Sequence, residues 1–394
     1  MAEAGAAARR ILLLSLDYAP ERSGIAVDAA DLAQWFTARG ASVEVVAGHR
    51  MAAGSWWRDE TGDGITVARC PVRRAALPRG LTGRAQTLSF ALSSAPALLR
   101  VARRFAPDLV AAFAPRPALL PATLMAARQA RARSWLHLTE DQPLPNADGL
   151  AGLARHFDHV SLAAISAEEK LASLGIAEAR RLALPPWVDT RAIYPLAAAN
   201  PIREALRLPE DAVVALYTGA LDDGHGLDLL LGAARRSPDQ GAVVYVVCGH
   251  GPAWRRLAGV ARHLPPFRLI PWPPADDLNA LLNLADIHVL PGGIGAADAL
   301  FPGKLAALLA SGRPVIAADD PRDLPPALGD AVAAVAPEPD AFAAAVIALA
   351  AAPAQLLRRG AAARRAAQDY YERQRVLRRL EQALALRPVD AATP

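Results

Sequence analysis

Short apolar runs alternate with amphipathic stretches along almost the whole chain of 394 residues, and this alternation limits the fold more than any other feature. In the first half, the runs that predict strands are 10–16, 42–48, 65–69, 108–114, 134–138 and 160–165. In the second half, they are 212–219, 242–249, 267–272, 286–292 and 313–318. Between them, 27–40 predicts a helix closed by Gly40 in a left-handed conformation. Apolar strands separated by helices are typical of parallel sheets covered on both faces, so we expect an α/β protein.

The alternation occurs in two halves of similar length, which predicts two Rossmann-like domains. The segment 184–202 divides them, because it is rich in proline and has no regular period. We therefore expect domains at 1–185 and 186–369, and a tail, 370–394, that carries a helix at 370–387. Ligands of open α/β sheets bind beyond the carboxyl ends of the strands. Two such domains facing each other across a cleft would build one site from loops of both halves.

The composition allows a large core, since 53% of the residues are hydrophobic. The net charge of +4 arises from arginine rather than lysine, and it permits a phosphate-bearing ligand or an anionic surface without requiring either. The only two cysteines, Cys70 and Cys248, are far apart and lack the spacing of metal ligands. This usage predicts neither a disulfide framework nor a zinc site, and it fits a reducing cytoplasm.

The N-terminal apolar run "ILLLSL" is shorter than a signal sequence requires and ends at Asp17, as a buried strand does. No window reaches the roughly 18–20 apolar residues that span a bilayer. We expect a cytoplasmic protein, either soluble or bound peripherally to the inner face of the cell membrane.

Two loops of the first half carry residues that suit chemistry. In 17–26, Gly24 lets the backbone approach a ligand just before a helix, whose free N–H groups suit an anionic or hydroxyl-rich group. A βα turn that needs glycine for packing gives the same pattern. In 137–146, His137, Glu140 and Asp141 can polarise or deprotonate a hydroxyl, although a histidine at a strand end is often structural.

Two glycine-rich loops follow strands of the second half. The loop 218–226 suits a phosphate held by backbone amides, but Asp222 and Asp223 oppose a bare phosphate site and no Walker-type lysine follows. The run 291–298 leads to Lys304 in the first turn of a predicted helix. A lysine there is unfavourable unless an anion joins it, so the pattern predicts an anion site. A solvated surface lysine is the alternative.

These residues resemble a known family. The stretches "DYAPERSGIAVDAADLAQWFTARGASVEVVAG", "LPPWVDT", "LYTGALDDGHGLDLLLGAARR", "CGHGP" and "ADALFPGKLAALLASGRPVIAA" are similar to the retaining family 4 glycosyltransferases, which have the two-domain GT-B fold. The stretch "LSFALSSAPALL" adds a resemblance to the colanic-acid and exopolysaccharide branch. The resemblance covers residues 10 to 385, and it implies that the tail helix crosses back to the first domain.

The resemblance implies transfer of a sugar, with retention, from a nucleotide-diphosphate donor to a polyprenyl-linked saccharide. His137, Lys304 and Glu140 are the implied catalytic residues, with Lys304 on the diphosphate of the donor. The implied donor-binding residues are Gly219, His225, Gly249, Gly293, Gly295, Asp298 and Lys304. Those of the acceptor-side loop are Arg22, Ser23 and Gly24. The resemblance implies no metal ion and no further cofactor.

Several positions depart from the family pattern. Ala299 and Ala307 stand where many members have glutamates, although the branch resembled also lacks them. Ala220 and His225 stand where an arginine and a lysine commonly hold the diphosphate, and Pro186 replaces an asparagine. Loss of two charge-assisted contacts removes several kcal/mol of donor binding, at roughly 1.5–3 kcal/mol each. The phosphate contact would then depend mainly on Lys304, helped by His225 or Arg22.

The segment 69–104 combines apolar residues with many arginines, namely Arg69, Arg73, Arg74, Arg79, Arg84, Arg100, Arg103 and Arg104. A basic, partly apolar surface suits anionic lipid, where each cation contributes about 1 kcal/mol. A solvated arginine face is the alternative. Nucleic acid is a poor partner, since stacking aromatics are not interleaved with the arginines.

Two other functions fit the same residues. The first is a GT-B protein with an eroded donor site that acts as a scaffold for another transferase, which Ala220 and His225 favour. The second is a nucleotide-sugar epimerase of the same fold, although the motifs match transferases better.

Overall fold

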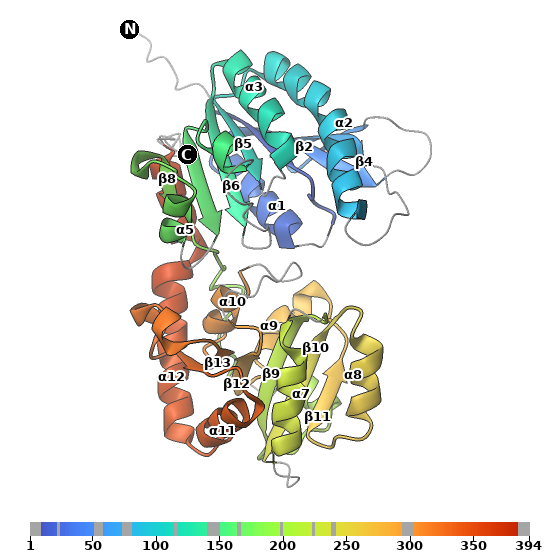
Figure 1. Cartoon of the computed structure of the whole chain (residues 1–394), viewed down its shortest axis with the longest axis vertical. Helices are drawn as coiled ribbons and strands as arrows, with labels where there is room; N and C mark the ends of the chain where they lie inside the picture. Colours follow the sequence, from blue (N-terminus) through green and yellow to red (C-terminus); the bar gives the residue numbers. More distant parts are fainter. Residues whose placement is uncertain are drawn as a thin grey trace, which may run out of the picture. The chain divides into compact units, whose positions relative to one another are not determined.

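The computed structural model describes residues 9–21, 24–50, 58–72, 81–113, 117–139, 150–163, 167–197, 200–222, 225–237, 242–293 and 303–384. It divides into two compact units, one of residues 1–185 with 377–394 and the other of residues 186–376 (Figure 1). Each unit is an α/β structure around its own sheet. The fold class predicted from the alternation of strands and helices is confirmed.

The first unit contains a sheet of eight strands in the order β3-β4-β2-β1-β5-β6-β7-β8. Its strands are β1 Arg10–Ser15, β2 Ser42–Arg50, β3 Arg58–Gly62, β4 Ile65–Val72, β5 Leu109–Phe113, β6 Arg133–Thr139, β7 His159–Ala163 and β8 Arg181–Ala183. Its helices are α1 Gly24–Thr37, α2 Leu81–Phe105, α3 Leu120–Ala130, α4 Leu150–Ala154 and α5 Ala167–Ser173. All strand pairs are parallel except β3 with β4.

The second unit contains a parallel sheet in the order β11-β10-β9-β12-β13-β14. Its strands are β9 Val213–Ala220, β10 Val243–His250, β11 Phe267–Ile270, β12 Ile287–Leu290, β13 Val315–Ala318 and β14 Val332–Val335. Its helices are α6 Pro201–Ala205, α7 Leu227–Arg236, α8 Trp254–Ala261, α9 Leu278–Leu282, α10 Lys304–Ala310, α11 Pro339–Ala350 and α12 Pro353–Ala366. The last helix, α13 Arg373–Ala383, contains the boundary between the units.

Both faces of the second sheet are buried, as apolar strands require. Along β9, Ala215 and Tyr217 belong to one apolar cluster, whereas Val214 and Leu216 belong to another. The first cluster includes α7 and α11, and the second includes Leu281 of α9. Figure 1 shows α7 in front of β9. The buried alternation fixes the direction of every side chain at the carboxyl end of β9.

The predicted strands are all present, with ends that differ by a few residues. The predicted helix at 27–40 begins earlier, at Gly24, and ends at Thr37. A turn follows, in which Gly40 has φ +82° and donates a hydrogen bond from its N–H to the oxygen of Thr37 at 3.0 Å. Gly40 is left-handed, as predicted.

The short strands β3, β8 and β14 were not predicted from the sequence. Strand β3 pairs with β4 through a two-residue turn, Asp63-Gly64, whose φ values are +52° and +76°. An Asp-Gly pair is a strong hairpin signal because both positions need positive φ. This turn was therefore detectable, whereas β8 and β14 have only three and four residues.

Candidate functional site

The carboxyl ends of β9 and β10 meet in a contact between two backbones. Gly219 and Gly249 are register partners, and a Cβ on Gly249 would overlap the carbonyl oxygen of Gly219. Gly251, with φ +154°, is also confined, because its Cβ would overlap the oxygen of Leu221. Glycine at 249 and 251 therefore has a packing reason, which exists whether or not these residues touch a ligand.

The loop after β12 closes on the same edge of the sheet. Gly226, with φ +69°, lies so near Pro291 that a Cβ would overlap the oxygen of that proline. At Gly293, with φ +87°, a Cβ would lie 2.7 Å from a carboxylate oxygen of Asp319, which follows β13. Four adjacent parallel strands, β10, β9, β12 and β13, thus end in loops that pack closely together, at the location where α/β sheets bind ligands.

Lys304 brings a cation to this edge. It is the first residue of α10, preceded by Gly303 in the left-handed region at φ +68°. Its Nζ lies 4.3 Å from the ring centroid of Tyr217 at the end of β9. Tyr217 is 1% exposed, and its hydroxyl donates to the carbonyl oxygen of Ala220 at 2.7 Å. The cation–π contact with this buried ring holds the ammonium of Lys304 near the carboxyl end of β9.

Lys304 was predicted from the sequence, whereas Tyr217 and Thr218 of β9 were not. Tyr217 stands inside an apolar run, where nothing in the sequence shows which side chain it faces. Thr218 is 1% exposed, and its Oγ1 has no hydrogen-bond partner among the described residues. A buried hydroxyl without a partner costs free energy, so this atom beside Gly219 is suited to a ligand.

Composition gives a further signal at Lys304. Of the 43 basic side chains in the sequence, only Lys170 and Lys304 are lysines. A solvated cation on this chain is therefore almost always arginine. The lysine at position 304 therefore indicates a site that needs a compact ammonium and that the planar guanidinium of arginine does not suit.

The loop between β9 and α7 is confirmed as a strand-to-helix turn, but its described residues include no lysine or arginine. His225 is buried, and its Nδ1 pairs with a carboxylate oxygen of Asp222. The main chain of Ala220 accepts the hydrogen bond from Tyr217. Among its described residues, this loop therefore adds no lysine or arginine to the charge of Lys304.

In the first unit, His137 lies near the carboxyl end of β6 and is 2% exposed. Its Nδ1 lies 2.8 Å from Oγ of Ser161, and its ring centroid lies 4.5 Å from that of Phe113. Burial lowers the pKa of His137 to about 3. The side chain is therefore neutral at physiological pH, which favours a positioning role over a charged one.

The acceptor-side loop is described only in part. Gly24 is the first residue of α1 and is buried. Arg22, Ser23, Glu140, Gly295 and Asp298 lie outside the described residues, so their predicted roles remain predictions. The strands β1 and β6 are parallel in one sheet, so Gly24 and His137 belong to the same edge of it.

The predicted basic surface needs a correction at Arg69. This residue is 6% exposed, its guanidinium carbon lies 5.7 Å from the ring centroid of Tyr18, and it donates to the oxygen of Ala19. Burial raises the pKa of Tyr18 to about 12 despite the opposing charge of Arg69. Arg69 therefore supports the loop after β1 and takes no part in a surface. Arg100, Arg103 and Arg104 are exposed.

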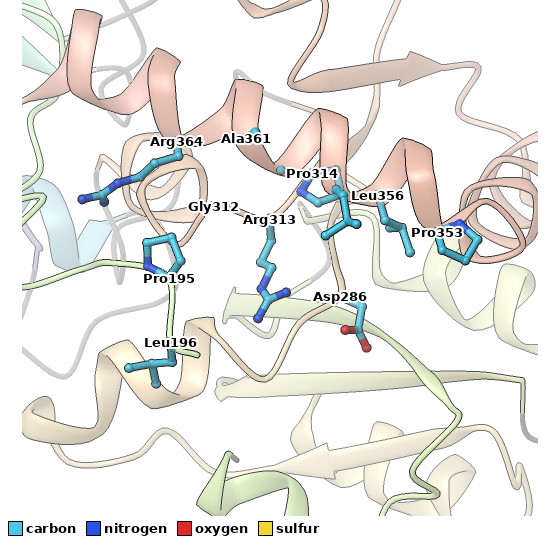
Figure 2. Close-up of a pocket in the computed structure, with 12 residues that line it drawn as sticks. Pro195, Leu196, Asp286, Gly312, Arg313, Pro314, Pro353, Leu356, Ala361 and Arg364 are labelled. Carbon is cyan, nitrogen blue, oxygen red and sulfur yellow. The ribbon is translucent and has the colours of Figure 1, made fainter. Parts of the chain in front are cut away.

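A pocket of about 590 Å³ lies at the opposite edge of the second sheet (Figure 2). Asp286 and Arg313 line it from just before β12 and β13, and Pro353 and Leu356 line it from α12. Arg364 of α12 donates to the carbonyl oxygens of Thr190, Ile193 and Ala310. The pocket lies between the segments that precede β12 and β13 and the helix α12, and its lining residues do not include those of the loops that hold Lys304.

Two further findings concern the described residues only. No group of three or more His, Cys, Asp or Glu side chains among them could hold a metal ion. No single helix among them is long and apolar enough to cross a membrane, although α11 with Pro353–Tyr371 passes by length and composition as a pair bent by 99°. Cys70 and Cys248 are both buried and are not joined in a disulfide, and burial raises the pKa of Cys248 to about 12.

Two family models match this chain. A family model described as glycosyl transferases group 1 matches residues 212–352, and a glycosyl transferase 4-like model matches residues 23–187. WcaI of Escherichia coli strain K12, assigned to colanic acid biosynthesis as a glycosyl transferase, is 29% identical over 336 residues. That match covers 77% of this chain and 81% of WcaI.

Solved structures share the fold over nearly the whole chain. Sucrose-phosphate synthase from Thermosynechococcus elongatus has a TM-score of 0.73 at 17% identity, over 95% of this chain and 98% of its own. HepE from Anabaena in complex with UDP has a TM-score of 0.72 at 16% identity, over 95% and 99%. Fold and sequence together define a glycosyltransferase of the GT-B fold. The chain belongs to the family 4 glycosyltransferases and resembles their colanic-acid branch.

Proposed function

We propose that this glycosyltransferase moves a sugar, with retention, from a nucleotide-diphosphate donor to a polyprenyl-linked saccharide in exopolysaccharide or cell-surface glycan synthesis. The observation that carries the proposal is the position of Lys304. Its Nζ lies 4.3 Å from the ring centroid of Tyr217, at the edge of the sheet where glycine-containing loops follow β9, β10 and β12. HepE, whose fold is similar, has been solved with UDP and with UDP-glucose. This supports a nucleotide sugar as the donor.

Lys304 would bind the diphosphate and stabilise the negative charge that develops on the leaving nucleotide. Stabilising that charge is the main task of such a reaction. We propose that Lys304, with backbone N–H groups, does this without a metal ion. Asp319 beside Gly293 suits the hydroxyls of a sugar, because a carboxylate accepts hydrogen bonds from them and repels phosphate.

Turnover tests the proposal directly. The purified protein would be incubated with radiolabelled nucleotide sugars and a lipid-linked saccharide extract, and labelled lipid would be measured, with anomeric configuration assigned by NMR. We expect transfer from one donor with retention, and at least about a 10²-fold lower rate for Lys304→Ala. Full transfer by Lys304→Ala would contradict the phosphate assignment, and inversion would contradict the proposed stereochemistry.

The two lysines offer a second test that needs no acceptor. An amine-reactive reagent labels Lys304, Lys170 and the N-terminal amine, and mass spectrometry measures each site separately. A nucleoside diphosphate at the proposed site should slow the labelling of Lys304 and leave that of Lys170 unchanged. Equal labelling of Lys304 with and without every nucleotide tried would argue against the site.

A scaffold without donor turnover is the second candidate function. It is favoured by the β9–α7 loop, where Ala220 and His225 replace the usual arginine and lysine and His225 is already paired with Asp222. Such a protein would bind no nucleotide and transfer no sugar, yet would raise the activity of a partner transferase. Nucleotide binding that Lys304→Ala abolishes would decide against it.

We also propose that the enzyme works at the inner face of the cell membrane, where a polyprenyl-linked acceptor is available. Supporting this, α2 exposes Leu88 and Leu92, which are 57% and 78% exposed, on a helix that ends in exposed Arg100 and Arg103. Apolar side chains followed by cations on one helix suit an anionic lipid surface.

A further inference from the structure

A buried polar row in the first sheet consists of Trp135, His137 and Ser161, with the ring of Phe113 beside that of His137. Phe113, His137 and Ser161 are register partners on β5, β6 and β7, and Trp135 lies two residues before His137 on the same face of β6. Nε1 of Trp135 donates to Oγ of Ser161 at 2.9 Å, and the same Oγ lies 2.8 Å from Nδ1 of His137. Trp135 and Ser161 are fully buried.

The hydrogen-bond donors and acceptors of this row determine which nitrogen of His137 carries the proton. The indole nitrogen can only donate, so Ser161 accepts from Trp135. Ser161 has a single proton, and Nδ1 of His137 is its only acceptor among the described residues. If Nδ1 carried a proton instead, the buried hydroxyl would have nowhere to donate, which is costly. The row is fully satisfied only when Nδ1 accepts and the proton of the neutral ring is on Nε2.

The surroundings of the ring keep it neutral. Burial lowers the pKa of His137, and the aromatic rings of Phe113 and Trp135 lie 4.5 Å and 5.8 Å away between centroids. Within the described part of the chain, Nε2 has no hydrogen-bond partner. The N–H at Nε2 is thus the one polar group that His137 can offer to a ligand.

We infer that Trp135 and Ser161 are positioning residues that hold His137 as an Nε2–H hydrogen-bond donor to an oxygen of the sugar substrate, and that His137 does not act as a base. Nδ1 is occupied by Ser161 and Nε2 already bears a proton, so neither nitrogen can take one from an acceptor hydroxyl. The identity of the ligand rests on the proposed function, whereas the tautomer does not.

Nitrogen NMR tests the tautomer without any substrate. Long-range ¹H–¹⁵N correlation of the ¹⁵N-labelled protein should show His137 with a protonated Nε2 and an unprotonated, hydrogen-bonded Nδ1, unchanged between pH 8 and pH 5. Ser161→Ala removes the hydroxyl that donates to Nδ1, so it should shift the Nδ1 signal and raise the share of the Nδ1–H tautomer. Trp135→Phe leaves the Ser161 proton in need of an acceptor, so it should change the share of the two tautomers less than Ser161→Ala does. A protonated Nδ1 in the wild-type protein would overturn the inference.

A matched control exists in the second unit. There, Nε2 of His288 lies 3.0 Å from Oγ of Ser311, which itself donates to the oxygen of Leu308. Ser311→Ala should therefore change the signals of His288 and leave those of His137 in place. If Ser311→Ala also changed the His137 signals, the assignment of the row to Ser161 would be wrong.

Activity tests the role as a donor. His137→Gln can place an amide N–H near the position of Nε2, so we expect kcat/KM within about 10-fold of wild type, against a loss of about 10- to 100-fold for His137→Phe. The pH profile of kcat/KM should show no ionisation of this histidine between pH 5 and pH 8. Equal losses for Gln and Phe would overturn the donor role. Absence of transfer by the wild type would instead refute the proposed function and leave the tautomer result standing.

Discussion

At the scale of single residues, Lys304 and Tyr217 form a cation–π pair. The ring of Tyr217 is buried between strand and helix, so it cannot move away from the ammonium that lies above it. A flexible lysine held in this way loses less conformational freedom when a diphosphate binds, which favours affinity. The glycines around it serve a different purpose, because most of them allow two backbones to touch.

Replacing Tyr217 separates the ring from its hydroxyl. Tyr217→Phe keeps the ring and should bind a nucleoside diphosphate with nearly wild-type affinity. Tyr217→Leu removes the cation–π contact and should raise Kd by about 3- to 10-fold. Titration calorimetry on both variants checks this, and equal affinity of the two would show that the ring does not position Lys304.

Gly249→Ala should destabilise the second unit by about 1–3 kcal/mol, because the added Cβ would overlap the carbonyl oxygen of Gly219. Gly259→Ala is the matched control. It lies in α8 with nothing within 4 Å of its Cβ, so alanine should raise stability by about 0.5–1 kcal/mol. Urea unfolding measures both, and a Gly249→Ala protein as stable as wild type would contradict the packing account.

At the scale of elements, alternation and turn chemistry explain most of the fold. Strands such as β9 and β10 are apolar throughout because both their faces are buried, and this made them visible in the sequence. Register is different, since it depends on partners far apart in the chain. The pairing of His137 with Ser161 therefore could not be predicted, although both residues lie in predicted strands.

The exposed face of α2 supports a prediction about membranes. The protein should bind vesicles that contain anionic lipid, and Leu88→Asp with Leu92→Asp should lower that binding by about 10-fold or more, since two apolar contacts become repulsive. Leu357→Asp is the control, because Leu357 is 76% exposed on α12. Cosedimentation measures binding, and equal loss in the control would show that α2 is not the contact.

At the scale of the whole molecule, each unit has its own core and each buries a histidine. Burial lowers the pKa of His137 and of His288 to about 3, helped at His288 by Arg313 and Lys304. The unfolded chain therefore binds more protons than the folded one below pH about 6.5. The stability from these two groups is complete above that pH and declines as the pH falls toward 3.

Between pH 7 and pH 5, each of these histidines should remove about 2 kcal/mol of unfolding free energy. Denaturant unfolding at the two pH values checks the direction and size. His288→Gln keeps a hydrogen-bond donor toward Ser311 but does not titrate. The loss of unfolding free energy between pH 7 and pH 5 should therefore be about 2 kcal/mol smaller in this variant than in the wild type. Stability that rises as the pH falls would contradict the burial of neutral rings.

The residues of the candidate site could be predicted where the local sequence marks them, and could not be predicted where they depend on tertiary packing. Lys304 follows a glycine-rich run and opens a helix, so the chain itself marks it. Tyr217 and Thr218 lie in an apolar strand, and only the arrangement of the strand ends shows that they face the cation or lack a partner. Arg69 was misassigned because an arginine in a basic stretch gives no sign that it will be buried over Tyr18.

The central claim is that Lys304 binds the diphosphate of a nucleotide, and calorimetric titration tests it most directly. UDP, GDP, ADP and dTDP would be titrated into the wild-type protein, Lys304→Ala and the control Lys170→Ala. We predict that one nucleotide binds wild type and Lys170→Ala equally and binds Lys304→Ala at least about 10-fold more weakly, as expected for a charge-assisted contact. Unchanged binding by Lys304→Ala, or no binding of any nucleotide to wild type, would contradict the account.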